Sequence, residues 1–189
     1  MKNTLLLVLV FLSFKGFSQS TEQKAKKTTF GFGINIIDNS STFKSQFLNA
    51  EENWNISPSI SKVGIETQLG EFFAVELSGS FNTISAKKIQ NAATIDKDFT
   101  FIGLDVNGKF YFDEFICKNS TFDAYFTAGV GAFSSDGQSN QTANTGMGFA
   151  YWFNSNLGLR LQTVGKYAFD KDQVLNNHIQ HSAELVFKF

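Results

Sequence analysis

Large apolar residues and small or polar residues alternate with a period of two along most of the chain. Between residues 30 and 36, phenylalanine and isoleucine at even positions oppose glycine and asparagine at odd ones. Successive side chains of a β-strand point to opposite sides, so this alternation predicts a strand with one apolar face. The pattern predicts eight strands in all, over residues 30–36, 56–69, 73–81, 102–112, 122–132, 146–153, 157–164 and 178–189.

The second run changes phase near its middle. Its apolar residues occupy even positions as far as Ile60 and odd positions from Val63 onward. An extra residue in one strand produces such a shift, so we expect a β-bulge near Ser61 and Lys62.

The connections between the predicted strands alternate in length. Two of them are tight turns, after the second and the sixth run, and the link from Asp113 to Ser120 is intermediate. Short turns at one end and long loops at the other are typical of bacterial outer-membrane barrels, whose short turns face the periplasm. The four long polar links are expected to run from Asp38 to Asn55, Ile84 to Asp98, Ser134 to Asn144 and Ala168 to Asn177.

Alternation alone does not decide which face points inward. A soluble lipocalin-like carrier would turn its apolar face toward a ligand, and a membrane barrel turns that face toward lipid. In this chain the apolar face lacks charge, the other face is rich in Gly, Ser, Thr and Ala, and aromatic residues recur near strand ends. These features favour an eight-stranded antiparallel up-and-down transmembrane β-barrel, an all-β fold.

The first residues have the order of a secretory signal peptide. Lys2 precedes an apolar run from Leu5 to Phe14, and the small residues Gly16 and Ser18 follow. This run is shorter than the roughly 20 residues of a spanning helix. We expect a leader over residues 1–18, a short segment over 19–28 and a barrel over 29–189, and therefore a chain exported to the periplasm.

Composition narrows the function classes further. The formal net charge is −1 and charged residues make up only 17% of the chain, whereas a nucleic-acid-binding protein normally carries a basic face. The one Cys cannot form an internal disulfide or a two-cysteine metal site. We expect no nucleic-acid partner, no metal and no cofactor.

Charged residues on the inward face predict an ion network. Glu66 and Glu76 should be cross-strand neighbours that repel each other unless cations intervene. Lys109 and Arg160 lie at a similar distance from the short-turn end and would neutralise them. Water-solvated, scattered charges are the alternative interpretation. The expected network is extended by Asp105, Asp123, Lys166, Glu184 and Lys188.

The last residues carry a likeness to a known family. Ser182, then apolar positions including Phe187, then the terminal aromatic Phe189 form a pattern similar to the signal that the barrel-assembly machinery recognises. The mature chain resembles the small eight-stranded bacterial outer-membrane barrels of the OmpA-barrel and OmpX kind, also described as porin-family outer-membrane β-barrel domains. That family often has glycine where Glu184 stands. The resemblance implies this fold, the outer membrane as location, and membrane lipid and the assembly machinery as partners.

The expected function is non-enzymatic, in envelope structure, adhesion or binding. Eight strands leave an interior that side chains fill, so binding would take place at the long loops, where Phe43, Phe47 and Trp54 are candidates for an extracellular ligand. A narrow channel for small or apolar solutes is the first alternative, and a lipid-modifying enzyme the second. His178 and Ser182 share a strand face, but four residues span about 13 Å, too far for a nucleophile and its base.

Overall fold

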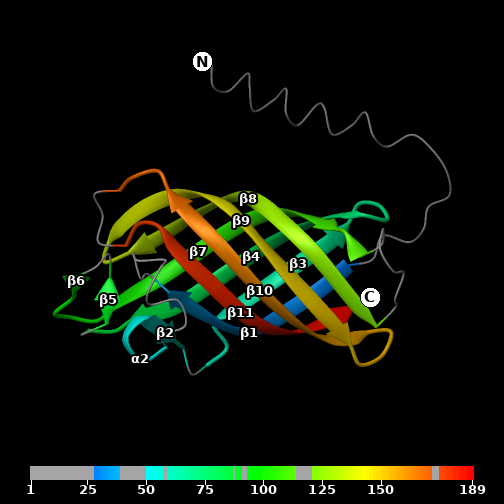
Figure 1. Ribbon diagram of the computed structural model, residues 1–189, viewed down its shortest axis with the longest axis horizontal. Coiled ribbons are helices and arrows are strands. Elements are labelled where there is room, and N and C mark those ends of the chain that lie inside the picture. Colours follow the sequence, from blue (N-terminus) through cyan, green and yellow to red (C-terminus); the bar gives the residue numbers. More distant parts are fainter. Residues whose placement is uncertain are drawn as a thin grey trace, which may run out of the picture.

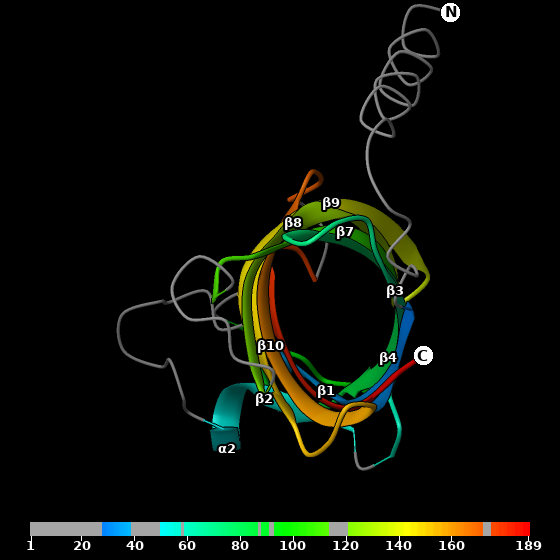
Figure 2. The ribbon, with the colours of Figure 1, turned by 90° about the vertical axis from the view of Figure 1, so that its right-hand side faces the viewer.

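The computed structural model describes residues 28–38, 50–57, 59–86, 88–90, 93–113, 121–171 and 175–189. The expected leader, Phe43 and Phe47 lie outside these ranges. Eight strands build a closed antiparallel barrel, as predicted (Figures 1 and 2). They are β1 (Thr28–Asp38), β3 (Lys62–Gln68), β4 (Phe73–Ile84), β7 (Phe99–Tyr111), β8 (Phe122–Ser135), β9 (Gln138–Trp152), β10 (Leu157–Ala168) and β11 (His178–Lys188).

The barrel strands pair in chain order, and the first and last strands close the ring. β11 pairs with β1 from Thr29↔Lys188 to Asp38↔Ile179. Thr28 and Phe189 exchange backbone hydrogen bonds just beyond this ladder. Closure leaves no barrel strand with an unpaired edge, which is the condition for placing a sheet in lipid.

The outer face of the barrel is apolar and the inner face is polar. On β7, Ile102 and Leu104 are each 57% exposed, whereas Asp105, which follows Leu104, is 4% exposed. A water-soluble barrel would have the opposite arrangement, because charged groups are costly to bury and apolar groups favour burial. The exposed apolar belt therefore faces lipid, which is inconsistent with a soluble carrier. No helix among the described residues is long and apolar enough to cross a bilayer.

The predicted bulge in the second run is a larger interruption than one residue. Short strand β2 (Trp54–Ile56) and β3 pair with the same edge of β1, through Ile36↔Ile56 and Gly33↔Lys62. Residues 57–61 thus oppose only residues 34–35. The Asn35 side chain donates to the carbonyl oxygens of Ser61 (2.7 Å) and Phe81 (2.9 Å), so it satisfies backbone groups that the ladder leaves open.

The long link expected from Ser134 to Asn144 is wrong. β8 and β9 continue to a two-residue turn at Asp136 and Gly137, whose φ angles are 50° and 75°. Positive φ at both positions is the signature of a type I′ hairpin turn, for which Asp-Gly is a strong sequence signal. The polar residues here belong to a hairpin, so β9 begins at Gln138 rather than near residue 146.

The other links contain small elements. The first includes α2 (Ala50–Asn53) and β2, and the second includes the two-residue strands β5 (Ile89–Gln90) and β6 (Ala93–Thr94). α2 lies beside the outside of the barrel wall (Figure 2). The small elements α2, β2, β5 and β6 lie toward one end of the barrel, opposite the tight β3–β4 and β9–β10 turns (Figure 1).

Inward glycines allow neighbouring strands to pack closely. A Cβ at Gly129 would lie 2.2 Å from the Val106 carbonyl oxygen, and one at Gly146 would lie 2.1 Å from that of Thr163. These positions exclude any side chain, because backbone carbonyl groups of the neighbouring strand occupy the space.

The apolar belt predicts that a charge on the outer face is tolerated only near the rim. Val106→Arg places a cation near the middle of the belt and should cost about 2–4 kcal/mol of folding free energy in bilayers, whereas Thr100→Arg, nearer the long-link end, should cost about 0–1. Urea-induced unfolding in lipid vesicles measures the loss of folding free energy in both variants. Equal effects, or a purified mature protein that stays monodisperse without detergent, would show that this face does not meet lipid.

Candidate functional site

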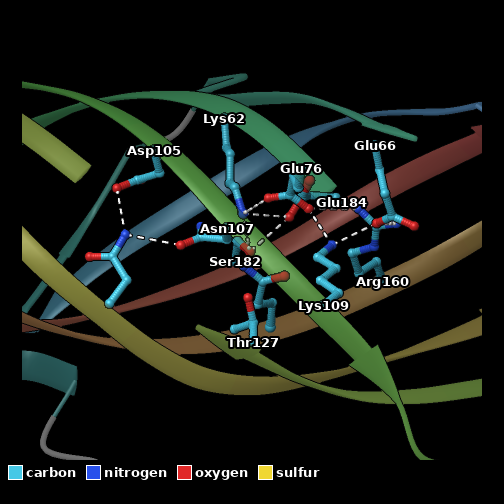
Figure 3. A network of polar contacts seen from close by, with 12 residues as sticks. Lys62, Glu66, Glu76, Asp105, Asn107, Lys109, Thr127, Arg160, Ser182 and Glu184 are labelled. Atoms are coloured by element: carbon cyan, nitrogen blue, oxygen red, sulfur yellow. Dashed lines mark hydrogen bonds and ion pairs between the residues drawn. The ribbon is translucent and has the colours of Figure 1, made fainter. Parts of the chain in front are cut away.

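Two carboxylates and two cations meet at the centre of the lumen (Figure 3). Glu66 and Glu76 are direct partners across β3 and β4, and both are buried. Lys109 of β7 donates to Glu66 Oε2 at 2.8 Å and also binds Glu76. Arg160 of β10 reaches across the lumen to Glu66 Oε2 at 2.8 Å and Glu76 Oε2 at 3.2 Å. The structure thus brings together the four residues that sequence reasoning placed at one level.

A third ion pair joins this cluster. Lys62 Nζ lies 2.9 Å from Glu184 Oε1 and 3.7 Å from Glu76 Oε1, and Ser182 donates to Glu184 at 2.9 Å. Sequence reasoning assigned Lys62 to the bulge and gave it no place in the lumen. Its inward direction follows from the odd number of extra residues in residues 57–61, which reverses the faces of the strand.

The six ionised groups make a neutral layer, which we call the charged layer: Glu66, Glu76, Glu184, Lys62, Lys109 and Arg160. Glu184 also pairs in register with Arg160 across β10 and β11. The Tyr111 hydroxyl donates to Glu66 Oε1 at 2.6 Å. Buried charges are tolerated when they are paired and hydrogen-bonded, so the equal numbers of acids and bases make this burial possible.

Two further predicted members of the network form a separate pair. Lys166 Nζ lies 2.5 Å from Asp105, and Asn144 donates to Asp105 at 3.0 Å and to Asn107 at 3.1 Å. A cavity of about 10 Å³, lined by Lys62 and Asp105 among others, lies between this pair and the charged layer. That volume admits about one water molecule.

The last two predicted members lie at the short-turn rim. Trp152 Nε1 donates to Asp123 Oδ2 at 2.6 Å, and Lys188 Nζ lies 3.8 Å from the centroid of a Trp152 ring. Asp123 and Lys188 are therefore connected through an aromatic ring rather than through the charged layer, with the lysine in a cation–π contact.

Aromatic side chains fill the lumen on both sides of the charged groups. Tyr111 and Tyr125 have ring centroids 5.2 Å apart toward the short-turn end. Toward the other end, Phe101 and Phe133 stack at 5.5 Å, and the His178 ring meets both edge-on. The second group packs with Ile37, Ile84, Phe99 and Leu175, and we call this apolar cluster the cap.

Sequence reasoning missed the cap, although a signal for it exists. Phe101 and Phe133 each lie one position beyond a predicted run, with the parity of inward residues. The structure also separates the residues weighed as a hydrolase. His178 lies in the cap, whereas Ser182 and Glu184 bond to each other at the charged layer.

The remaining candidates are Trp54 and the residues of the expected assembly signal. Trp54 is half-buried in β2, with its ring 5.3 Å from that of His181, which hydrogen-bonds Thr163 at 2.9 Å. Among the residues of the expected assembly signal, Ser182 points into the lumen. Phe187 stacks on Phe32 at 5.9 Å, and Phe189 is exposed.

Comparison with known proteins supports the fold. No protein-family model and no curated protein matches the sequence. The structure is similar to outer membrane protein OprG from Pseudomonas aeruginosa, with 12% identity, a TM-score of 0.59 and coverage of 88% of this chain and 97% of that one. Neisserial surface protein A is similar as well, with 15% identity, a TM-score of 0.56 and coverage of 87% of this chain and 97% of that one. Ail, the attachment invasion locus protein of Yersinia pestis, has 14% identity, a TM-score of 0.50 and coverage of 87% of this chain and 97% of that one.

These likenesses are too distant in sequence to transfer activity, and they establish the fold. The chain has the fold of small eight-stranded outer-membrane barrels, and its apolar belt and closed ladder satisfy the physical conditions for spanning that membrane.

The charged layer predicts a large penalty for unbalancing it. Arg160→Ala leaves Glu66 and Glu76 with Lys109 and Lys62 alone and should cost about 3–5 kcal/mol, as for other broken buried ion pairs. Lys97→Ala is the control, because Lys97 pairs with Asp136 at 3.1 Å on the surface, where a pair contributes less than about 1 kcal/mol. Urea unfolding in vesicles and heat-modifiable gel migration report the difference. An Arg160→Ala protein as stable as the Lys97→Ala protein would mean that water solvates the lumen charges.

Proposed function

We propose that this protein is a closed, non-catalytic barrel of the bacterial outer membrane that acts by presenting a binding surface at its extracellular rim. The observation that carries the proposal is the filled lumen. The cap, the Asp105–Lys166 pair, the charged layer and the tyrosine pair follow one another along the axis. Because paired charges and packed rings occupy the interior, an interaction with other molecules takes place outside it.

The β8–β9 hairpin supports a role for the rim. It continues as regular strand beyond the belt to the Asp136–Gly137 turn, so it projects as a rigid element rather than a loose loop. Rigid scaffolds that hold exposed loops are where binding sites concentrate. The names of two similar proteins, an attachment invasion locus protein and a surface protein, agree with this role.

The two alternatives have less support. A solute channel would need a path through the charged layer, where each cation is held by carboxylates on neighbouring or facing strands. A lipid-modifying enzyme would need a nucleophile and a base in contact, and His178 and Ser182 lie in different layers of the lumen.

The filled lumen predicts a barrel without conductance. Refolded protein in a planar lipid bilayer should leave the current at its baseline in concentrated KCl, because buried ion pairs span the lumen at the charged layer. A large porin measured in the same chamber is the positive control. Stepwise currents that scale with the amount of refolded barrel would favour the channel instead.

The rim predicts attachment that depends on the β8–β9 hairpin. Bacteria expressing the full chain should attach to cultured epithelial cells or to each other more than bacteria with an empty vector. Replacing residues 134–139 by Asn-Gly should abolish the gain while leaving the belt intact, as heat-modifiable migration will verify. A shortened variant that attaches like wild type, or a wild type that attaches like the empty-vector control, would argue against this role for the hairpin.

A further inference from the structure

A groove lies on the outer wall where the β8–β9 hairpin meets the start of the link after β10. It has a volume of about 460 Å³ and is lined by Ala132, Ser139, Asn140, Gln141, Phe169 and Asp170. Phe169 donates its backbone N–H to the Gln141 carbonyl at 3.0 Å, so both sides of the groove belong to one hydrogen-bonded surface. We call this feature the rim groove.

The rim groove lies above the apolar belt. Gln141 is twelve residues from Phe153, and Phe169 is twelve residues from Leu157, the residues that flank the tight β9–β10 turn. Twelve residues at about 3.3 Å each, tilted by about 40°, rise about 30 Å, which exceeds the roughly 25 Å height of an outer-membrane apolar band. A water-soluble ligand can therefore reach the rim groove.

Asn140 holds the two sides of the groove together. It is only 5% exposed, and its side-chain Nδ2 donates to the Asp170 carbonyl at 2.6 Å. Its Oδ1 accepts from the backbone N–H groups of Gln141 (2.9 Å) and Asp170 (3.1 Å). One buried amide thus fixes the floor, and the groove exists before any ligand binds.

The lining combines an aromatic ring with neutral hydrogen-bonding groups. The Phe169 side chain is 66% exposed, although it is large and apolar. Beside it, Gln141 is exposed and offers a side-chain amide, a group that both donates and accepts hydrogen bonds. A sugar ring has the matching chemistry, since one face carries C–H groups that stack on an aromatic ring and its edge carries hydroxyls.

We propose that the rim groove binds a neutral oligosaccharide, with Phe169 as the stacking platform and Gln141 as a hydrogen-bonding wall. This inference rests on the proposed function and gives a ligand class to that rim. Phosphorylated or sulfated ligands fit poorly, because the lining contains the carboxylate of Asp170 and no lysine or arginine. A purely apolar ligand fits poorly as well, since it would cover the Gln141 amide without pairing it.

The test is binding of the full barrel to an array of neutral oligosaccharides, with sucrose octasulfate as the charged comparator. The detergent must lack a sugar headgroup, because an alkyl maltoside would compete for the groove. Phe169→Ala should weaken binding of the best array ligand at least tenfold, and Gln141→Ala should weaken it severalfold. Tyr167→Ala is the matched control: Tyr167 is also exposed and lies two residues before Phe169, at the end of β10, but it does not line the groove.

Three results would overturn the proposal: no neutral saccharide bound, equal binding by the Phe169→Ala and Tyr167→Ala proteins, or preference for sucrose octasulfate. Failure of the groove is distinguishable from failure of the proposed function. If the Phe169→Ala protein binds saccharide like the Tyr167→Ala protein, and Phe169→Ala bacteria attach normally while the hairpin-shortened variant does not, the saccharide proposal is wrong and the adhesive role of the hairpin stands. If saccharide binds the groove but no attachment occurs, the proposal stands and the adhesive role fails.

Discussion

The arrangement of the lumen depends on one constraint, the placement of Glu66 beside Glu76 by the pairing of β3 with β4. Two buried carboxylates in contact cannot both stay ionised without cations, and the barrel supplies these from strands that are remote in sequence. Lys109 and Arg160 hold both acids, and Lys62 links Glu76 to Glu184. The charged layer therefore joins β3, β4, β7, β10 and β11 across the lumen, in addition to the ladders between neighbours.

The sequence predicts the parts of this structure that depend on local periodicity. Strand order, the lipid-facing side and the meeting of Glu66, Glu76, Lys109 and Arg160 all follow from parity and from distance to the short turns. The inward direction of Lys62 could not be predicted, because it depends on how many residues the interruption between β2 and β3 contains. The hydrogen bonds from Asn35 to Ser61 that satisfy this interruption are tertiary contacts, which local periodicity does not reveal.

Errors concentrate where strands leave the membrane. Beyond the belt, the outer face no longer needs to be apolar, so alternation fades although the ladder continues. The hairpin that ends at Asp136 and Gly137 was therefore predicted as a loop, and the cap residues Phe101 and Phe133 fell just outside the predicted strands. In both places the turn chemistry and the parity of inward residues carry information that hydrophobic alternation has lost.

A single rule connects the lumen, the lipid-facing wall and the rim groove: a polar group away from water must have a partner. In the lumen ion pairs supply such partners, and on the outer wall His181 Nδ1 pairs with the Thr163 hydroxyl while Trp54 covers the ring. Above the belt water itself is the partner, so Gln141 can stay exposed without cost until a ligand replaces that water. Selective binding is therefore expected at the rim, because an exposed side chain such as Gln141 meets water there, and a ligand can take the place of that water.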